Sequence, residues 1–449
     1  MSDSSSPTVP PPQVERAIRL SYGQAMLSSI YAASVGGMFI IGYALRLGAN
    51  NVQIGLMSTV PMYFVVMQLA ASVLVERGVS RRTMTIIGSL ANVSGWALVI
   101  LIPYLAPGAA PALKVGALIG VIALVTMFAQ VSGNARSSWI GDLIPAGFRG
   151  TFFGRLNMYA GIIGVVFALL EGIFLDHVKH MGIEAFSWLF GFGMLFGLAS
   201  ALLFVPQPDC PLVRREAGGG FVASVRDTFA NGPLMLVMVF ALAWSMQSMA
   251  GPFYATYMLR DLEMPFLGVG AVNAVATLTL LLSSPFWGRV VDRYGCRPVL
   301  IACTLALAPA PLVWIWMNSA MAVYAAVPAI NLCVGFAAAG VSVALSTLIY
   351  KVTPSAGRSV QFAIYSTVVV LAVAPLPTVG GYLPRLLEVI GVDYDVRATF
   401  YFSVLFMLAA AWAARRLREP DSRQTRELMR NLPGHLRRPH SLRGHDRDA

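Results

Sequence analysis

The sequence predicts an all-α membrane protein in which twelve transmembrane helices form two parallel-repeat six-helix bundles. Three observations predict this class: an apolar composition, twelve apolar stretches long enough to span a bilayer, and loop motifs that recur in both halves of the chain. Six spans separate the repeated loops, so both copies lie on one side of the membrane, as in repeats related by an axis normal to it.

The composition excludes a soluble enzyme. Of 449 residues, 57% are hydrophobic and only 12% are charged, whereas soluble domains carry about 25% charged residues. So few charges cannot solvate a globule of this size, and lipid must cover much of its surface. The four cysteines and five histidines show no ligand spacing, so neither a metal site nor a cofactor is expected.

The apolar stretches fit transmembrane helices. A spanning helix needs about 20 mainly apolar residues. Twelve stretches meet this condition: 20–44, 53–75, 84–105, 113–136, 152–175, 183–205, 233–257, 266–288, 297–317, 320–347, 360–382 and 397–414. The first exceeds the 7–15 apolar residues of a signal peptide, so we predict a span there rather than a cleaved signal.

One loop is much longer than the others and divides the chain almost evenly. The predicted organisation is a disordered segment (1–15), a first six-helix bundle (16–206), a linker containing three consecutive glycines (207–232), a second six-helix bundle (233–416) and a basic tail (417–449). No loop has room for a soluble catalytic domain, so we predict neither enzyme activity nor catalytic residues.

The basic residues predict the orientation. With the amino terminus inside, 26 of the 32 Lys and Arg lie on the inner side, ten of them from Arg415 onward. The positive-inside rule then places both termini in the cytoplasm. The expected location is the inner (cytoplasmic) membrane, or a specialised intracellular membrane derived from it. The net charge of +11 thus indicates a membrane surface rather than a nucleic-acid partner.

Two inner loops repeat one pattern, an acid followed by Arg and by a second Arg four positions later. The copies are Glu76, Arg77 and Arg81 in the first half, and Asp292, Arg293 and Arg297 in the second, 216 residues apart. A second pair, Pro145 with Arg149 and Pro354 with Arg358, recurs 209 residues apart. Any single Arg is explained better as an orientation signal, but chance explains the repeated pattern poorly.

These loops resemble those of the major facilitator superfamily. Gly288-Arg-Val-Val-Asp292-Arg293-Tyr-Gly295-Cys-Arg297 is similar to the family's G-x-x-x-D-R-x-G-x-R loop, and Asp142 to Gly150 resembles its loop after the fourth helix. The first-half copy departs from the pattern at Ser72, Glu76 and Val79. The resemblance implies a set of gating residues: Glu76, Arg77, Arg81, Asp142, Arg149, Gly288, Asp292, Arg293, Gly295, Arg297 and Arg358.

A latch is the physical role expected of these loops. A carboxylate near a helix start accepts hydrogen bonds from free backbone N–H groups and pairs with neighbouring arginines. Such links hold while the inner mouth is closed and break when it opens.

The resemblance also implies a central cavity lined by the first, fourth, seventh and tenth spans. The polar residues predicted to line it are Gln24, Tyr31, Gln130, Asn134, Trp244, Gln247, Tyr254 and Asn331. The alternative is that these side chains bond the helices to one another, as polar groups in membranes often do.

Glu171 is the one acid that we place well inside a span. An intramembrane carboxylate is a functional hypothesis by default, here a proton-coupling group, and the alternative is an interfacial Glu near Asp176 and His177. The first span has no acid and the fifth lacks the Gly-Pro pair of the family's antiporters, which disfavours drug/proton antiport.

The predicted function is secondary active transport of a small neutral or weakly polar solute by alternating access. The protein is expected to act as a monomer in the bilayer, and whether a proton is the coupling ion stays open. A non-transporting membrane scaffold or assembly factor with the same fold is the alternative. A weaker alternative is transport of iron or an iron chelate, because Arg16 to Phe64 resembles magnetosome-membrane members of the superfamily.

Overall fold

Every regular element that the structure describes is a helix. The structure, a computed structural model, describes residues 11–76, 78–105, 107–144, 149–209, 221–353, 358–389, 398–417 and 419. In these residues, eleven helices are long and apolar enough to cross a membrane. The remaining predicted span, α18 (Ala398–Arg416), packs within the bundle and ends on Arg415 and Arg416. The predicted all-helical membrane fold is confirmed, with eleven rather than twelve helices meeting both conditions.

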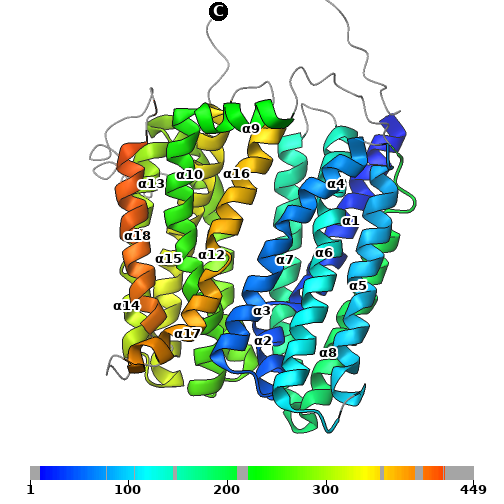
Figure 1. Cartoon of the computed structure of the whole chain (residues 1–449), viewed down its shortest axis with the longest axis vertical. Coiled ribbons are helices and arrows are strands. Elements are labelled where there is room, and N and C mark those ends of the chain that lie inside the picture. Colours follow the sequence, from blue (N-terminus) through cyan, green and yellow to red (C-terminus); the bar gives the residue numbers. More distant parts are fainter. Residues whose placement is uncertain are drawn as a thin grey trace, which may run out of the picture.

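The helices gather into two groups that stand side by side (Figure 1). The first group contains α1 (Pro11–Val35), α2 (Gly37–Arg46), α3 (Asn51–Tyr63), α4 (Met67–Glu76), α5 (Arg81–Leu105), α6 (Pro111–Leu143), α7 (Arg149–His177) and α8 (Ile183–Leu202). The second contains α10 (Gly232–Ser245), α11 (Gly251–Thr256), α12 (Phe266–Tyr294), α13 (Cys296–Leu307), α14 (Ala310–Val313), α15 (Ala320–Val352), α16 (Arg358–Val373), α17 (Leu376–Val389) and α18.

Each group is held together by helix pairs that pack along their length. In the first group α5 packs against α6, and α1 packs against α7 and α8. In the second, α12 and α13 both pack against α15. Small residues permit this close approach: a Cβ added at Gly335 of α15 would lie 2.3 Å from the carbonyl oxygen of Ala276 on α12. Backbones that approach this closely gain packing energy that lipid tails cannot supply.

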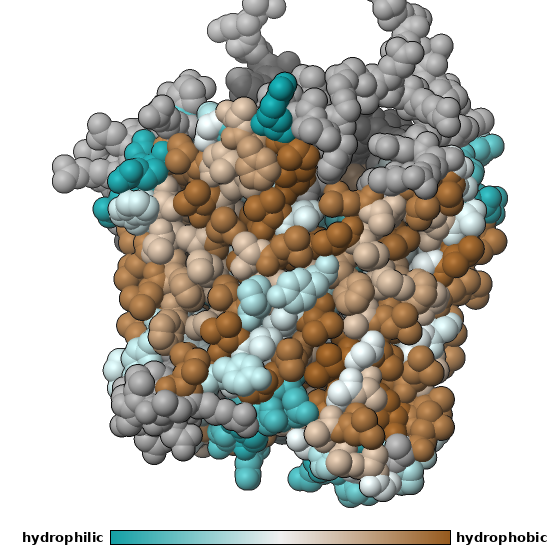
Figure 2. All heavy atoms as spheres, in the orientation of Figure 1, coloured by the Kyte–Doolittle hydropathy of each residue, from teal (hydrophilic) through white to brown (hydrophobic). Residues whose placement is uncertain are grey.

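The amphipathic helix α9 (Phe221–Ala230) lies across one end of the bundle (Figure 1), which we call the linker end. The other end, called the opposite end, holds the turns between α2 and α3 and between α7 and α8. Between the two ends, the face seen in Figure 2 is mainly apolar, with hydrophilic residues near both ends. Large apolar side chains such as Leu282 (79% exposed) and Leu105 (74%) face outward, as expected where lipid is the solvent.

Two of the spans are broken near their middle. The first changes from α1 to α2 at Gly36, and Gly37 adopts a φ of +53°, a backbone conformation that favours glycine. The seventh changes from α10 to a 3-10 segment, η4 (Met246–Ala250), and then to α11. A broken helix leaves backbone N–H and C=O groups without intrahelical partners, which a membrane protein tolerates only where these groups are buried in protein or line a cavity. Both breaks lie beside the same cavity.

Candidate substrate cavity

A cavity of about 860 Å³ lies between the two helix groups. Residues of α2 and α3 line it from the first group, and residues of α10, η4, α11, α12 and α15 line it from the second. Its volume falls in the range of small-molecule sites, about 300–1,000 Å³. None of the described residues that line it carries a charge, and five are methionines, Met38, Met57, Met62, Met258 and Met407.

The break in the seventh span supplies most of the polar surface on one side of the cavity. Because the 3-10 segment η4 changes the helical repeat, the consecutive residues Gln247 and Ser248 both line the cavity, together with Trp244 one turn earlier. The Ser248 hydroxyl is buried and has no hydrogen-bond partner within the described residues. Such a group is costly unless something satisfies it, so a ligand or water in the cavity would be favoured there.

An aromatic wall adjoins these polar groups. Tyr254 of α11 stacks on Phe400 with ring centroids 4.4 Å apart and planes 4° apart, and its ring lies 5.1 Å from that of Trp314. Tyr254 and Trp314 both line the cavity. Stacked rings hold each other in place, which makes this wall a rigid surface for an apolar or aromatic part of a ligand.

Two asparagines of the second group reach the cavity in different ways. Asn331 of α15 is 9% exposed, and its Nδ2 donates to the backbone oxygen of Val272 at 2.6 Å. It therefore bonds α15 to α12 as well as lining the cavity. Asn273, which follows Val272 in α12, is exposed and lines the cavity. Its side chain forms no hydrogen bond with the described residues.

The predicted cavity residues of the first span lie in a separate, smaller cavity of about 230 Å³. There Gln24 donates to Ser200 at 2.9 Å, and Tyr31 donates to Asn92 at 2.9 Å. Arg136 of α6 shares this cavity and lies 3.5 Å from the side-chain oxygen of Gln24. The structure thus separates Gln24 and Tyr31 from the central cavity.

Gln130 and Asn134 of the fourth span line neither cavity. Gln130 accepts a hydrogen bond from Gln68 at 2.6 Å, and Asn134 donates to the backbone oxygen of Gln68 at 3.0 Å. Both bonds join α6 to α4, which is the bonding role that the sequence left as the alternative. Of the eight predicted cavity residues, the structure brings together Trp244, Gln247, Tyr254 and Asn331.

Comparisons with known proteins agree with this architecture. Residues 236–443 match the family model described as Major Facilitator Superfamily. The fold is similar to that of a mutant of the nucleoside transporter NupG, with a TM-score of 0.66 and 13% identity over 90% of this chain and 100% of that one. It is also similar to a bacterial homologue of the human lysosomal transporter Spinster, described as inward-facing and unoccupied (TM-score 0.64, 14% identity, 92% and 100% covered). The second half of the chain thus matches the major facilitator superfamily, and the whole chain has the fold of that superfamily's transporters.

The transporter FucP, described as being in the outward conformation, is a third superfamily structure with this fold (TM-score 0.58, 13% identity, 90% and 98% covered). A comparison with curated protein sequences finds no match. At these identities the structural likeness shows the superfamily fold and not the substrate.

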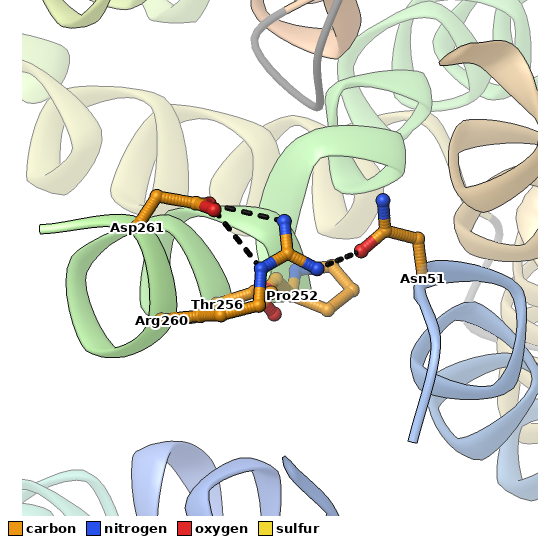
Figure 3. Close-up of polar contacts among 5 residues, drawn as sticks. All are labelled: Asn51, Pro252, Thr256, Arg260 and Asp261. Carbon is orange, nitrogen blue, oxygen red and sulfur yellow. Dashed lines mark hydrogen bonds and ion pairs between the residues drawn. The ribbon is translucent and has the colours of Figure 1, made fainter. Parts of the chain in front are cut away.

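At the opposite end of the bundle, polar contacts join the two helix groups. Arg260, at the end of the seventh span, pairs with Asp261 and donates to the side-chain oxygen of Asn51 at 2.6 Å (Figure 3). Asp176, at the end of α7, accepts hydrogen bonds at 2.8 Å from the backbone N–H groups of Phe266 and Leu267. These are free N–H groups in the first turn of α12, where a carboxylate also faces the positive end of the helix dipole.

Close backbone packing seals the same end between α3 and α17. A Cβ at Gly55 would lie 2.4 Å from the carbonyl oxygen of Pro377, and one at Gly381 would lie 2.5 Å from that of Asn51. The hydroxyl of Thr378 donates to that of Thr59 at 2.8 Å. We call this set of contacts, from Asp176 and Arg260 to Gly55 and Gly381, the opposite-end seal.

The predicted gating loops lie at the linker end. The side chains of Glu76, Arg77, Asp142, Arg149 and Arg358 fall outside the described residues. Arg81 is 3% exposed and donates to Ser138 at 2.9 Å, within the first group. In the second group, Asp292 is exposed and forms no ion pair in the described part of the chain, and Arg293 lies over the ring of Tyr294 at 5.6 Å. A Cβ added at Gly288 would have no atom within 4 Å, so no close packing requires glycine there. Gly295, between α12 and α13, has a φ of +91°, a backbone conformation that favours glycine.

Glu419, just beyond α18, occupies the start of α13. Its side chain is 3% exposed, accepts from Lys351 at 2.8 Å and accepts from the backbone N–H of Arg297 at 2.9 Å. Burial raises the pKa of Glu419, but the hydrogen bonds from Lys351 and from the backbone outweigh burial, so its pKa lies below the ordinary value. The Arg297 guanidinium donates to the backbone oxygen of Arg415 at 2.8 Å. The second-half loop therefore bonds to the end of its own group.

Glu171 does not face the central cavity. It is 4% exposed, and one carboxylate oxygen is 2.5 Å from the hydroxyl of Ser34 on α1. Ser34 lies two residues before the break at Gly36. The other oxygen, Oε2, is buried with no partner within the described residues, and the residue lines a groove between α7 and α8.

Two features of the site, Asn273 and the role of Asp176, were not predicted from the sequence. Asn273 was missed because the polar residues were sought in four of the spans only, although a lone amide in the eighth apolar stretch is itself a signal. Ser248 was not missed, because the sequence already places it with Trp244, Gln247 and Tyr254 on one polar face of the seventh span. Asp176 was noted only as an interfacial acid, and nothing in the sequence places it against the start of α12.

Proposed function

We propose that this protein is a secondary transporter that moves a small neutral solute through the central cavity by alternating access. The observation that carries the proposal is a cavity between the two helix groups whose described lining is uncharged. On one wall the Ser248 hydroxyl has no partner among the described residues, and stacked aromatic rings lie beside it. In parallel-repeat transporters the substrate site lies near the middle of the bilayer between the repeats.

The chain is proposed to be in an inward-facing conformation. The opposite-end seal joins α3 to α17 and α7 to α12, whereas the second-half gating loop bonds within its own group. We take the linker end as cytoplasmic because most of the Lys and Arg fall on that side. The inward-facing state described for the Spinster homologue, a fold neighbour, is consistent with this orientation.

The lining supports a substrate of mixed polarity without net charge. A charged solute would lose its hydration with no opposite charge to replace it. Amide and hydroxyl groups suit hydrogen bonding, and methionine side chains adapt to ligands of different shape. Among the described residues, the lining offers no carboxylate, thiol or imidazole to a bare iron ion. Within the iron alternative, a neutral chelate is therefore the species that this cavity would accept.

Proton coupling is proposed to act through Glu171. A buried carboxyl bonded to Ser34 connects α7 to α1 just before the glycine break. Gain or loss of a proton at the carboxyl would change whether the Ser34 hydroxyl or the Glu171 carboxyl donates the hydrogen bond between them. The bonding of the two helices beside the cavity would then change with it.

The test combines ligand binding with transport. A thermal-shift screen of purified protein against neutral metabolites, including nucleosides, sugars and iron chelates, should find compounds that raise the melting temperature, because a ligand of the folded state stabilises it. Uptake or efflux of the hit in vesicles should then be lost in Gln247→Ala. A hit that binds but is not moved by the wild type would favour the scaffold alternative.

Coupling is tested separately with Glu171→Gln. This variant should still bind the hit and exchange it down its gradient, while losing the ability of an imposed pH gradient to drive accumulation. Accumulation that stays driven by the pH gradient in Glu171→Gln would contradict this role for the carboxyl.

A further inference from the structure

A second pocket lies outside the transport path, between α7 and α8. It is a groove of about 620 Å³ lined by apolar and aromatic side chains, and Glu171 is the one ionisable residue among the described residues that line it. It shares no lining residue with the central cavity. Trp188 is 67% exposed, and Leu170 is 51% exposed, so its rim lies on the surface that faces lipid.

The carboxyl of Glu171 gives this groove a chemistry that lipid tails do not satisfy. The residue is 96% buried, since only 4% is exposed, and its Oε2 has no hydrogen-bond partner within the described residues. Ser34 satisfies only the other oxygen. An isolated carboxylate in an apolar site is costly unless it carries a proton or meets a cation.

The aromatic walls of the groove also favour a cation beside the Glu171 carboxylate. The rings of Phe167 and Phe192 stack with centroids 6.3 Å apart, and Phe174 and Trp188 complete the aromatic lining. Aromatic faces attract ammonium groups, most strongly where water is excluded. A carboxylate combined with aromatic rings is the combination that selects a protonated amine on an apolar body.

The depth of the site favours a lipophilic amine over a phospholipid headgroup. Glu171 lies six residues before the end of α7 at His177, which is about 9 Å along a helix. Lys179 and His180 are exposed in the turn beyond that end. In a phospholipid with an ammonium headgroup, the phosphate lies deeper in the membrane than the ammonium group. To pair its ammonium with Glu171 and its phosphate with Lys179 or His180, the headgroup would have to reverse this order. A single hydrophobic cation needs no such inversion.

We propose that the groove between α7 and α8 is a membrane-facing binding site for a lipophilic organic amine, whose ammonium group pairs with the free oxygen of Glu171. The apolar body lies among the aromatic residues, and the ligand enters from the bilayer. The site lies outside the central cavity, so amine binding can be tested without transport of the cavity solute, although the site shares Glu171 with the proposed proton coupling.

Photolabelling in lipid nanodiscs tests the site directly. The probe is 4-(aminomethyl)benzophenone, a lipophilic amine that crosslinks on illumination, and its neutral counterpart is 4-(hydroxymethyl)benzophenone. After digestion and mass spectrometry, the amine should label peptides that contain residues 167–174 and 188–192. The alcohol should label them about tenfold less, because it forms no charge-assisted bond with the carboxylate.

Three variants make the result specific. Glu171→Gln should lower amine labelling of these peptides about tenfold, and Trp188→Leu, an exposed position that the fold does not need, should lower it several-fold. Glu184→Gln, an exposed acid in the first turn of α8, should label as the wild type does. Equal labelling by amine and alcohol, unchanged labelling of Glu171→Gln, or labelling concentrated on α10 and α11 would overturn the proposal.

Discussion

Arg260 and Asn51 belong to different helix groups, and the Arg260 guanidinium donates to the Asn51 side-chain oxygen at 2.6 Å at the opposite end of the bundle. Asn51 follows Asn50, whose side chain caps α3 in a reciprocal bond with Gln53. The contact therefore fixes the end of the seventh span against the rigid start of α3. Together with Asp176 and the close glycines, it closes one side of the central cavity.

Asp176→Asn should weaken the opposite-end seal. The substitution removes the negative charge that accepts from Phe266 and Leu267, and charge-assisted bonds contribute about 1.5–3 kcal/mol each. The population open at this end should rise about tenfold or more. Ser58 of α3 lines the central cavity. In a Ser58→Cys background, a membrane-impermeant maleimide should label the cavity faster from that side.

The matched control is Glu263→Gln, an exposed acid three residues before Phe266. Its labelling rate should equal that of the Ser58→Cys background. If Asp176→Asn labels no faster than this control, the carboxylate does not hold the end closed.

Gly55→Ala should prevent tight closure of the same end. The added Cβ would lie 2.4 Å from the Pro377 carbonyl oxygen, which is backbone and cannot move without shifting α17. Overpacking of this kind costs about 1–3 kcal/mol. Thermal unfolding in detergent should show a lower melting temperature, and Ser58→Cys should again label faster.

Gly191→Ala separates this effect from helix propensity. Gly191 lies in α8 with nothing within 4 Å of an added Cβ, so alanine there should be neutral or stabilising by up to about 1 kcal/mol. Equal melting temperatures for Gly55→Ala and Gly191→Ala would contradict the packing argument.

Asn273→Leu and Asn331→Leu should differ in kind. Asn331 donates to the Val272 backbone, so its loss should lower the free energy of unfolding by about 1–2 kcal/mol. Asn273 has no such bond, so its loss should leave the melting temperature unchanged while abolishing the shift caused by a cavity ligand. Two variants with the same stability and the same ligand response would show that the asparagines share one role.

Glu419→Gln should destabilise the linker end in a pH-dependent manner. Because the folded-state pKa of Glu419 is lowered, the ionised carboxylate stabilises the fold above its ordinary pKa of 4.5, and this contribution is lost as the pH falls through the folded value. At pH 7 the melting temperature of Glu419→Gln should lie below that of the wild type, by an amount equivalent to about 1–3 kcal/mol.

The difference between the two proteins should shrink as the pH falls below 4.5. Asp292→Asn, which changes an exposed acid near the end of α12, should show no stability change at neutral pH. A constant difference between Glu419→Gln and wild type from pH 7 to pH 3 would mean that the charge of Glu419 is not what stabilises this contact.

The helices could be predicted because each span is a local property of the chain. Twenty apolar residues in succession must form a helix in lipid, since only intrahelical bonds satisfy the backbone there. The first predicted span, 20–44, corresponds to one continuous apolar run, yet the structure breaks it at Gly36. A glycine pair permits such a break without requiring it, so the sequence could not place the hinge.

The site was only partly predictable for a related reason. Four predicted positions of the seventh and tenth spans do line the cavity: Trp244, Gln247, Tyr254 and Asn331. Gln130 and Asn134 fit the same pattern but bond to Gln68. An amide on a helix face satisfies its hydrogen bonds with whatever faces it, and the rotation of neighbouring helices decides whether that is a ligand or another helix.

By itself the sequence determined that this protein is an α-helical membrane protein, and its repeated loops pointed to the superfamily, because hydrophobicity and short motifs are written along the chain. The tertiary structure alone decided which end is closed, that Asp176 caps α12, and that Glu171 faces a lipid-side groove rather than the cavity. These facts depend on contacts between helices that are distant in the sequence. Their packing is set by shape and close approach over the whole bundle, which no local pattern records.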